Sequence, residues 1–363
     1  MFWKKFAIIV SGLLGSLQAA EIAGCPKIEA SQIPAAKNVY DLHPSHIKII
    51  ASIGDSITSG VGAKNIEKPF AALSDFKQWR GLSWLNGGDE DATSIANYIK
   101  HYSPSVYGSS HGMRDMAMCP DTFFCLKYEH DFEVDQLNAA LPSAVSSSFV
   151  DQVNYLIKYI GNGTAYDNDW KMINVFLGSN DISVSCMPGY REEDFNKNMR
   201  AGLDLIKEKI PKVIVNLVSI FHTEKIVRRE QPGYRKLFEH SPELNPRHYE
   251  SLCSQIPVFG DIDLSAHVEQ FNRALEKIGR DYHSTPFNSF TATFRNLNID
   301  IDSIPYYALS NLDEFHPNVH MYHFMSKVLW NQMLDPRANP SERLEFNEDL
   351  PLYCVSAADR FRT

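Results

Sequence analysis

The chain has 363 residues, with 44 acidic against 35 basic side chains and a formal net charge of −9. Lys4 and Lys5 are the only charged side chains among the first 20 residues, so removal of that stretch takes the formal net charge to −11. This balance argues against nucleic acid as a partner. No linker, repeat or low-complexity tract divides the remainder, so we expect a single domain over residues 21–363, with its core at about 46–334.

Residues 1–20 have the pattern of a secretory signal peptide. Lys4 and Lys5 precede an apolar core at 6–15, and small residues at 18–20 suit cleavage. The core is too short to span a bilayer, and no other segment approaches the roughly 18 apolar residues that a membrane helix requires. We therefore expect a secreted or lumenal protein without a transmembrane segment; an uncleaved anchor is the alternative.

All six cysteines follow the predicted leader, and an even number in a secreted chain suggests disulfides. Their spacing does not resemble a zinc site. Cys119 and Cys125 are close enough to pair locally, and elimination leaves Cys186 with Cys253 and Cys25 with Cys354, although six cysteines allow 15 connectivities. Asn162-Gly163-Thr164 is a glycosylation sequon, expected in a surface loop.

Apolar runs and helical periodicities alternate along the chain. We expect strands at Ile47 to Ile53, Asp135 to Leu141, Lys171 to Leu177 and Lys212 to Ser219. The expected helices are Phe149 to Ile160, Phe195 to Ile210, His267 to Tyr282, and a last helix containing Met325 to Met333. The stretch from Trp79 to Asp131 is interpreted as an insertion. The alternation predicts an α/β fold with a central parallel sheet between two helical layers.

The first strand ends in Gly54-Asp55-Ser56, where the chain must turn sharply. Ser56 would lie at the carboxyl end of a strand, where open α/β sheets bind ligands. An ordinary N-cap serine is the alternative interpretation.

The third strand ends in Gly178-Ser179-Asn180-Asp181, at the corresponding position. The side-chain amide of Asn180 could donate to a developing oxyanion, or Asn180 could simply occupy a turn.

Near the end of the chain, Asp313 and His316 are three residues apart and precede Pro317. Asp313 could therefore hold the His316 imidazole in the tautomer that a general base needs.

These residue types belong to one chemistry. A serine needs a base within hydrogen-bond reach, and histidine has an unperturbed pKa of about 6.5. Candidate oxyanion donors are the Ser56 N–H, the N–H of Ser143 after Pro142, and Asn180. The mechanism requires no metal or cofactor. The Gly-x-Ser-x-Gly elbow of α/β-hydrolases is absent.

The three motifs, in this order, resemble the blocks of the GDSL, or SGNH, hydrolase superfamily. The phospholipase B-like branch is similar in further motifs: Trp79 to Trp84 with Gly87-Gly88-Asp89, Leu137 to Ala140, Phe315-His316-Pro317 and Ser326 to Asn331. The resemblance implies a flavodoxin-like three-layer fold with a catalytic triad of Ser56, His316 and Asp313. One departure is Ser143, at the position of the usual oxyanion-hole glycine.

The leader predicts secretion, and the resemblance implies a serine esterase acting on phospholipids or lysophospholipids. A carbohydrate or small-ester esterase, or a catalytically silent lipid-binding protein, are the alternatives. The segment 220–259 could meet a lipid surface, because apolar residues alternate there with Lys225, Arg228, Arg229, Arg235 and Lys236. A solvated helix face, balanced by Glu224, Glu230 and Glu239, is the other interpretation.

Overall fold

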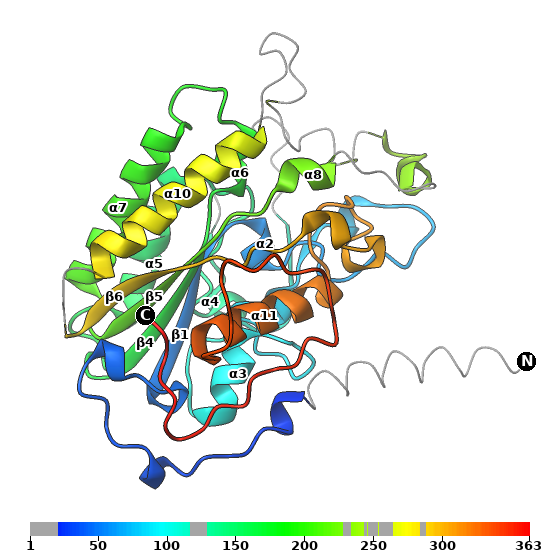
Figure 1. Ribbon diagram of the computed structural model, residues 1–363. Helices are drawn as coiled ribbons and strands as arrows, with labels where there is room; N and C mark the ends of the chain where they lie inside the picture. Colours follow the sequence, from blue (N-terminus) through cyan, green and yellow to red (C-terminus); the bar gives the residue numbers. More distant parts are fainter. Residues whose placement is uncertain are drawn as a thin grey trace, which may run out of the picture.

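The computed structural model describes residues 21–116, 129–227, 234–242, 245, 253, 264–283 and 288–363. Its centre is a parallel sheet in the order β1-β4-β5-β6, formed by Ile47–Gly54, Trp170–Phe176, Val213–Val218 and Phe290–Arg295 (Figure 1). Helices α5 (Phe149–Ile160), α7 (Glu192–Lys209) and α10 (Leu264–His283) cover one face. Helices α3 (Ile95–Tyr102) and α11 (Val319–Leu334) cover the other. The predicted three-layer fold is confirmed.

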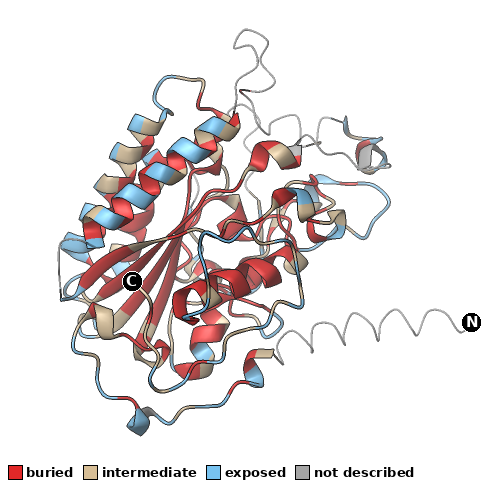
Figure 2. Cartoon of the chain, viewed as in Figure 1, coloured by how far each residue is buried: buried red, intermediate tan, exposed pale blue. Residues whose placement is uncertain are grey.

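Strand side chains alternate between two hydrophobic cores, and Figure 2 shows the sheet as the most buried part of the molecule. Along β5, Val213, Val215 and Leu217 face the α5–α7–α10 layer, whereas Ile214 and Val218 face the α3–α11 layer. Because both faces are covered, β1, β4 and β5 are largely apolar, which is why the sequence shows these three strands as apolar runs.

The expected strand from Asp135 to Leu141 is wrong at its start. Asp135 ends the short helix α4 (Phe132–Asp135), and Gln136 turns the chain with a φ of 47°. The next residues run beside β1: the N–H of Ser52 donates to Leu137 O, and those of Ala139 and Leu141 donate to Ser52 O and Gly54 O. The segment 137–141 therefore lies parallel to β1 as an irregular edge without forming a regular strand.

Helix α5 has the predicted bounds. Helices α7 and α10 each begin three residues before the predicted start. The acidic residues Glu192, Glu193 and Asp194 favour an early start for α7, because they lie at the positive end of its dipole. Strand β6 was not predicted; its sequence Phe-Thr-Ala-Thr-Phe-Arg lacks a long apolar run.

Short elements form the loops around these layers. They are α2 (Ser56–Ser59), β2 (Lys77–Gln78), β3 (Arg114–Asp115), α6 (Ser179–Ser183) and α8 (Thr223–Val227). The expected insertion contains α3, whose Tyr98 packs against Trp330 of α11 with ring centroids 5.3 Å apart. Part of this stretch is therefore core structure.

Two of the three predicted disulfides are present. Cys25 pairs with Cys354, which joins the two ends of the described chain, and Cys186 pairs with Cys253. Cys119 and Cys125 lie outside the described residues, as do the predicted leader and Arg228 and Arg229. Within the described ranges, no helix combines the length and apolarity needed to cross a bilayer.

Candidate active site

Ser56, His316 and Asp313 lie in hydrogen-bond contact although 260 residues separate the first two. The Ser56 hydroxyl Oγ is 2.7 Å from His316 Nε2. On the other side of the ring, His316 Nδ1 is 2.5 Å from Asp313 Oδ2. The arrangement can take a proton from Ser56 onto an imidazole that a carboxylate orients.

The turn from β1 into α2 sets the position of Ser56. Its backbone needs Gly54, because a Cβ there would lie 2.3 Å from Thr58 Oγ1 and 2.5 Å from the Phe176 carbonyl. Gln152 of α5 fixes Gly54 by exchanging two hydrogen bonds with its backbone, at 2.9 and 3.0 Å. Asp55 then caps α2 by accepting from the Ile57 N–H. Ser56 is therefore the first residue of a helix at the end of a buried strand.

Asp313 is 1% exposed, and its local chain supplies its partners. Oδ1 accepts hydrogen bonds from the N–H groups of Phe315 and His316, both at 2.9 Å. Burial would raise the pKa of Asp313, but the His316 charge and these bonds outweigh it and lower the pKa. For His316, burial works against the charged form, yet the Asp313 carboxylate raises its pKa above 6.5. The pair therefore favours an ionised carboxylate beside a basic imidazole.

Ser143 follows the irregular edge segment 137–141 and Asn180 follows β4, on either side of β1. Segment 137–141 and β4 flank that strand, so Ser143, Ser56 and Asn180 come after three adjacent carboxyl ends. Asn180 Nδ2 donates to the Ala144 carbonyl at 2.9 Å, which connects the two outer loops. An amide carries two N–H groups, so Asn180 retains one for another acceptor. Ser143 has a φ of 60°, a conformation that favours glycine.

Two residues that the sequence analysis did not assign hold these loops. The first is Arg80, which is fully buried. Its guanidinium donates to the carbonyls of Asn138 and Ala140 at 3.1 and 2.8 Å and forms an ion pair with Asp135 at 3.2 Å. Arg80 thereby fixes the segment that leads into Ser143. Arg80 stands within the Trp-Arg-Gly motif that the sequence analysis noted, but that motif does not indicate which groups Arg80 contacts.

The second is Asp181, directly after Asn180. Its carboxylate accepts from the backbone N–H and the hydroxyl of Ser146, at 2.8 and 2.5 Å. It therefore fastens the loop after Ser143 to helix α6. The sequence analysis noted Asp181 as part of the Gly-Ser-Asn-Asp motif but assigned it no role.

Two further carboxyl groups lie beneath the site. Asp55 and Asp181 are each 1% exposed, and burial raises the pKa of each to about 7. Repulsion by the Asp55 carboxylate contributes to the raised pKa of Asp181. The strand ends thus combine one ionised carboxylate, Asp313, with two that are hard to ionise.

Asn162 lies apart from these residues. It is exposed in the loop between α5 and β4, at the amino end of β4, whereas Asn180 follows its carboxyl end. The Asn162 side chain donates to the Glu208 carbonyl at 3.0 Å. The predicted sequon is thus on the surface, at the opposite edge of the sheet.

We compared the chain with protein families and with individual proteins. A family model described as GDSL-like Lipase/Acylhydrolase matches residues 50–329. Phospholipase B1, membrane-associated, of Homo sapiens is 27% identical over 363 residues, covering 95% of this chain and 23% of the human protein. The proteins of the same name from Mus musculus and Rattus norvegicus are 27% and 26% identical, covering 93% and 87% of this chain. This chain spans less than a quarter of the length of each relative. Since the family match includes both the Ser56 turn and the Asp313–His316 loop, and extends over most of the sequence, the chain belongs to the GDSL-like lipase/acylhydrolase family.

Proposed function

We propose that this protein is a secreted serine ester hydrolase that cleaves acyl esters of phospholipids or lysophospholipids. The observation that carries the proposal is the continuous contact from Ser56 Oγ through His316 to Asp313. Family membership supports acyl-ester chemistry, and the name of the relatives supports a phospholipid substrate.

In this proposal, His316 Nε2 takes the Ser56 proton as Oγ attacks the acyl carbonyl carbon. The tetrahedral intermediate collapses when the leaving alcohol oxygen receives that proton from His316, which leaves an acyl-enzyme ester on Ser56. Water, deprotonated by His316, then attacks the ester carbonyl, and the carboxylic acid leaves as the proton returns to Ser56. Asp313 stabilises the imidazolium in both halves of the reaction without taking its proton.

The intermediate's oxyanion needs donors that are already in position. We assign this role to the backbone N–H groups of Ser56 and Ser143 and to the second N–H of Asn180. Support comes from their places after three adjacent strand ends, and from the bond that joins Asn180 to the Ser143–Ala144 loop. A backbone donor does not require glycine, so Ser143 is compatible with this role.

Secretion and domain organisation form part of the same proposal. The leader-like sequence of residues 1–20 and the two disulfides suit an oxidising compartment. We propose residues 21–363 as one hydrolase domain, glycosylated at Asn162.

The first test is hydrolysis of a substrate panel by purified protein. The panel contains phosphatidylcholine, lysophosphatidylcholine, an acetylated sugar and a short-chain nitrophenyl ester. We expect fatty acid release from the two lipids, and we expect Ser56→Ala to abolish nearly all of it. Ser183→Ala is the matched control, because that hydroxyl bonds the Ser179 carbonyl within helix α6. Preference for the acetylated sugar would overturn the lipid assignment, and full activity of Ser56→Ala would overturn the nucleophile.

A further inference from the structure

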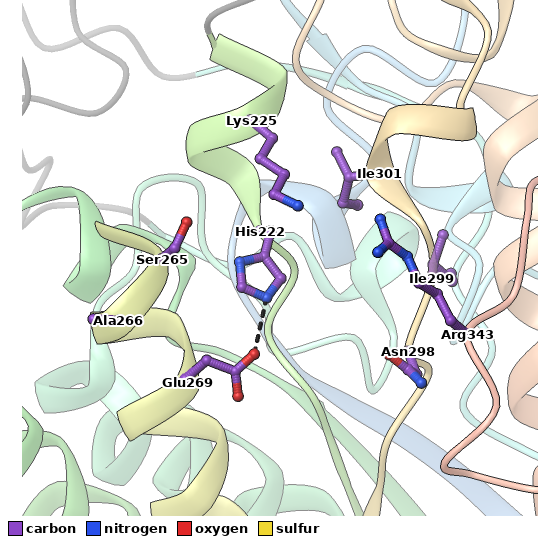
Figure 3. Close-up of a pocket in the computed structure, with 9 residues that line it drawn as sticks. All are labelled: His222, Lys225, Ser265, Ala266, Glu269, Asn298, Ile299, Ile301 and Arg343. Carbon is purple, nitrogen blue, oxygen red and sulfur yellow. Dashed lines mark hydrogen bonds and ion pairs between the residues drawn. The ribbon is translucent and has the colours of Figure 1, made fainter. Parts of the chain in front are cut away.

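A second cleft opens at the same edge of the sheet, beyond the ends of β5 and β6. Its volume is about 390 Å³, and an adjoining cavity of about 220 Å³ shares His222, Glu269, Asn298 and Ile299 with it. Figure 3 shows α8 on one side, the start of α10 on another, and residues 298–301 with Arg343 opposite. Ser56 follows β1, which is two strands from β5 and three from β6, or about 10 to 15 Å across the sheet.

Two cations meet in this cleft from opposite walls. Lys225 Nζ and Arg343 Nη2 both approach the same atom, Asp302 Oδ2, at 3.6 and 3.8 Å. In Figure 3 the ammonium and the guanidinium extend toward one another. Neither contact is short enough for a hydrogen bond. The space between the cations thus accommodates one oxygen of an anion, and Asp302 fills it loosely.

Most donors of these two cations are unused among the residues that the structure describes. Lys225 Nζ has no hydrogen-bond acceptor there, and Arg343 donates only through Nη2, to Asp300 at 2.6 Å. The side chain of Asp302 is 62% exposed, so it can swing into solvent at little cost. An anion with several oxygens could accept from Lys225 and from the Nε and Nη1 groups of Arg343.

The other charges of the cleft have partners of their own. His222 lies between Glu224 and Glu269, at 3.0 and 3.2 Å. The hydrogen bond with Glu224 raises the pKa of His222 although burial opposes it, so the imidazolium offsets these two carboxylates. Ser265 also donates to Glu224. Ile299 and Ile301 add an apolar wall beside the cations.

We propose that this cleft binds a phosphate ester group between Lys225 and Arg343, in place of the Asp302 carboxylate. A phosphate diester presents two oxygens that share one negative charge to the two cationic side chains, and the apolar wall accommodates an attached carbon chain. The site itself stands on this geometry; that the ester belongs to a phospholipid headgroup rests on the hydrolase function proposed above.

The test is phosphorus NMR with inorganic phosphate and the full chain at low salt. We expect saturable line broadening, and about tenfold weaker binding in Lys225→Gln and in Arg343→Gln. Asp302→Asn removes the competing carboxylate and should bind phosphate more tightly. The control is Lys277→Gln, which removes the same charge from an exposed position of α10. Absence of saturable binding, or equal affinities in all five proteins, would overturn the site.

A second arm distinguishes the source of the phosphate group. Glycerophosphocholine carries a headgroup but no acyl ester, so it reports binding whether or not the protein hydrolyses lipids. If glycerophosphocholine competes with inorganic phosphate for the wild-type protein and does not compete for Lys225→Gln, the cleft is assigned to a lipid headgroup. Binding of inorganic phosphate without competition by glycerophosphocholine would overturn the headgroup source and assign a site for free phosphate.

Discussion

The two halves of the sheet's carboxyl edge place charge in opposite ways. Beyond β1 and β4, the carboxyl groups of Asp55, Asp181 and Asp313 are each 1% exposed and accept backbone hydrogen bonds. Beyond β5 and β6, Asp302 and Arg343 have side chains that are 62% and 58% exposed and contact each other at 3.8 Å. The first half holds its carboxyl groups rigidly and out of water, and the second holds charged groups where a solute can displace them.

In the two proposals above, this difference separates the groups that react from the groups that bind an anion. A group that stabilises a transition state must already be oriented in a low-dielectric site, where a charge interacts strongly. A group that captures an anion can remain solvated, although exposed ion pairs contribute little to stability. Substitutions beyond β1 and β4 should therefore have large effects on rate or stability, and those beyond β5 and β6 should change binding alone.

The largest expected effect comes from Asp313→Asn. The amide keeps the shape of the side chain but loses the charge that supports an imidazolium, so kcat should fall by about 10⁴-fold. The measurement is turnover of a short-chain nitrophenyl ester, with Asp281→Asn, an exposed carboxylate of α10, as control. Loss of less than about tenfold would show that Asp313 does not support His316.

Arg80→Met tests whether the loop before Ser143 depends on a buried cation. The change leaves Asp135 with an ion pair to Arg114 and a hydrogen bond with His130, and it removes donors from the Asn138 and Ala140 carbonyls. Removal of one partner from a buried pair costs about 3–5 kcal/mol. We expect this loss in the free energy of unfolding from urea titration, together with reduced activity. Arg280→Met is the control, since Arg280 pairs with Glu276 on the surface of α10. Equal stability of the two variants would contradict the bracing role.

Asn180→Ala tests the oxyanion donors. Loss of one donor should reduce kcat by roughly 100-fold or more with little change in KM, because the interaction forms mainly in the transition state. Ser143→Gly is the companion change: it keeps the N–H and suits the φ of 60°, so activity should stay near wild type. A large loss in Ser143→Gly would mean that the hydroxyl has a role of its own.

The smallest expected effect is a displacement of the pH profile. His316 must be neutral to act as a base, and Asp313 raises its pKa above 6.5. The acid limb of kcat/KM should therefore have its midpoint above pH 6.5, with activity lost as the pH falls. In Asp313→Asn the residual activity should show its limb at lower pH, because only the weaker effect of Asp55 then opposes the burial that lowers the pKa of His316. If the acid limb has the same midpoint in Asp313→Asn as in wild type, the limb does not report the titration of His316.

The sequence was sufficient to predict candidate site residues where a reactive or polar side chain directly follows a strand or lies in a recognisable motif. Ser56 and Asn180 each follow an apolar run, and Asp313 and His316 share one turn, so local patterns identified all four residues before their contacts were known. The layers followed from alternating periodicities. Phe290–Arg295 lacked such a pattern, and Gln136, at a φ of 47°, interrupts an otherwise strand-like run.

Contacts between distant segments could not be predicted where neither a motif nor a cysteine marks them. Arg80 meets the Asn138 and Ala140 carbonyls across about 60 residues, and Lys225 and Arg343 converge on Asp302 from separate elements. Neither arrangement has a periodicity or a spacing that a single sequence displays. The sequence thus located the groups that we propose to react, and the structure supplied the residues that position them.

The most direct test of the central claim, that Ser56 is an activated nucleophile, is covalent labelling. A fluorophosphonate reacts with a serine whose proton a neighbouring base can remove, displacing fluoride and forming a stable phosphonyl ester. Mass spectrometry of peptides from the labelled protein should show one adduct per chain, on Ser56, and the adduct should be lost in His316→Ala and retained in His320→Ala. Labelling of another serine, or an unlabelled Ser56 in the folded wild-type protein, would contradict the account.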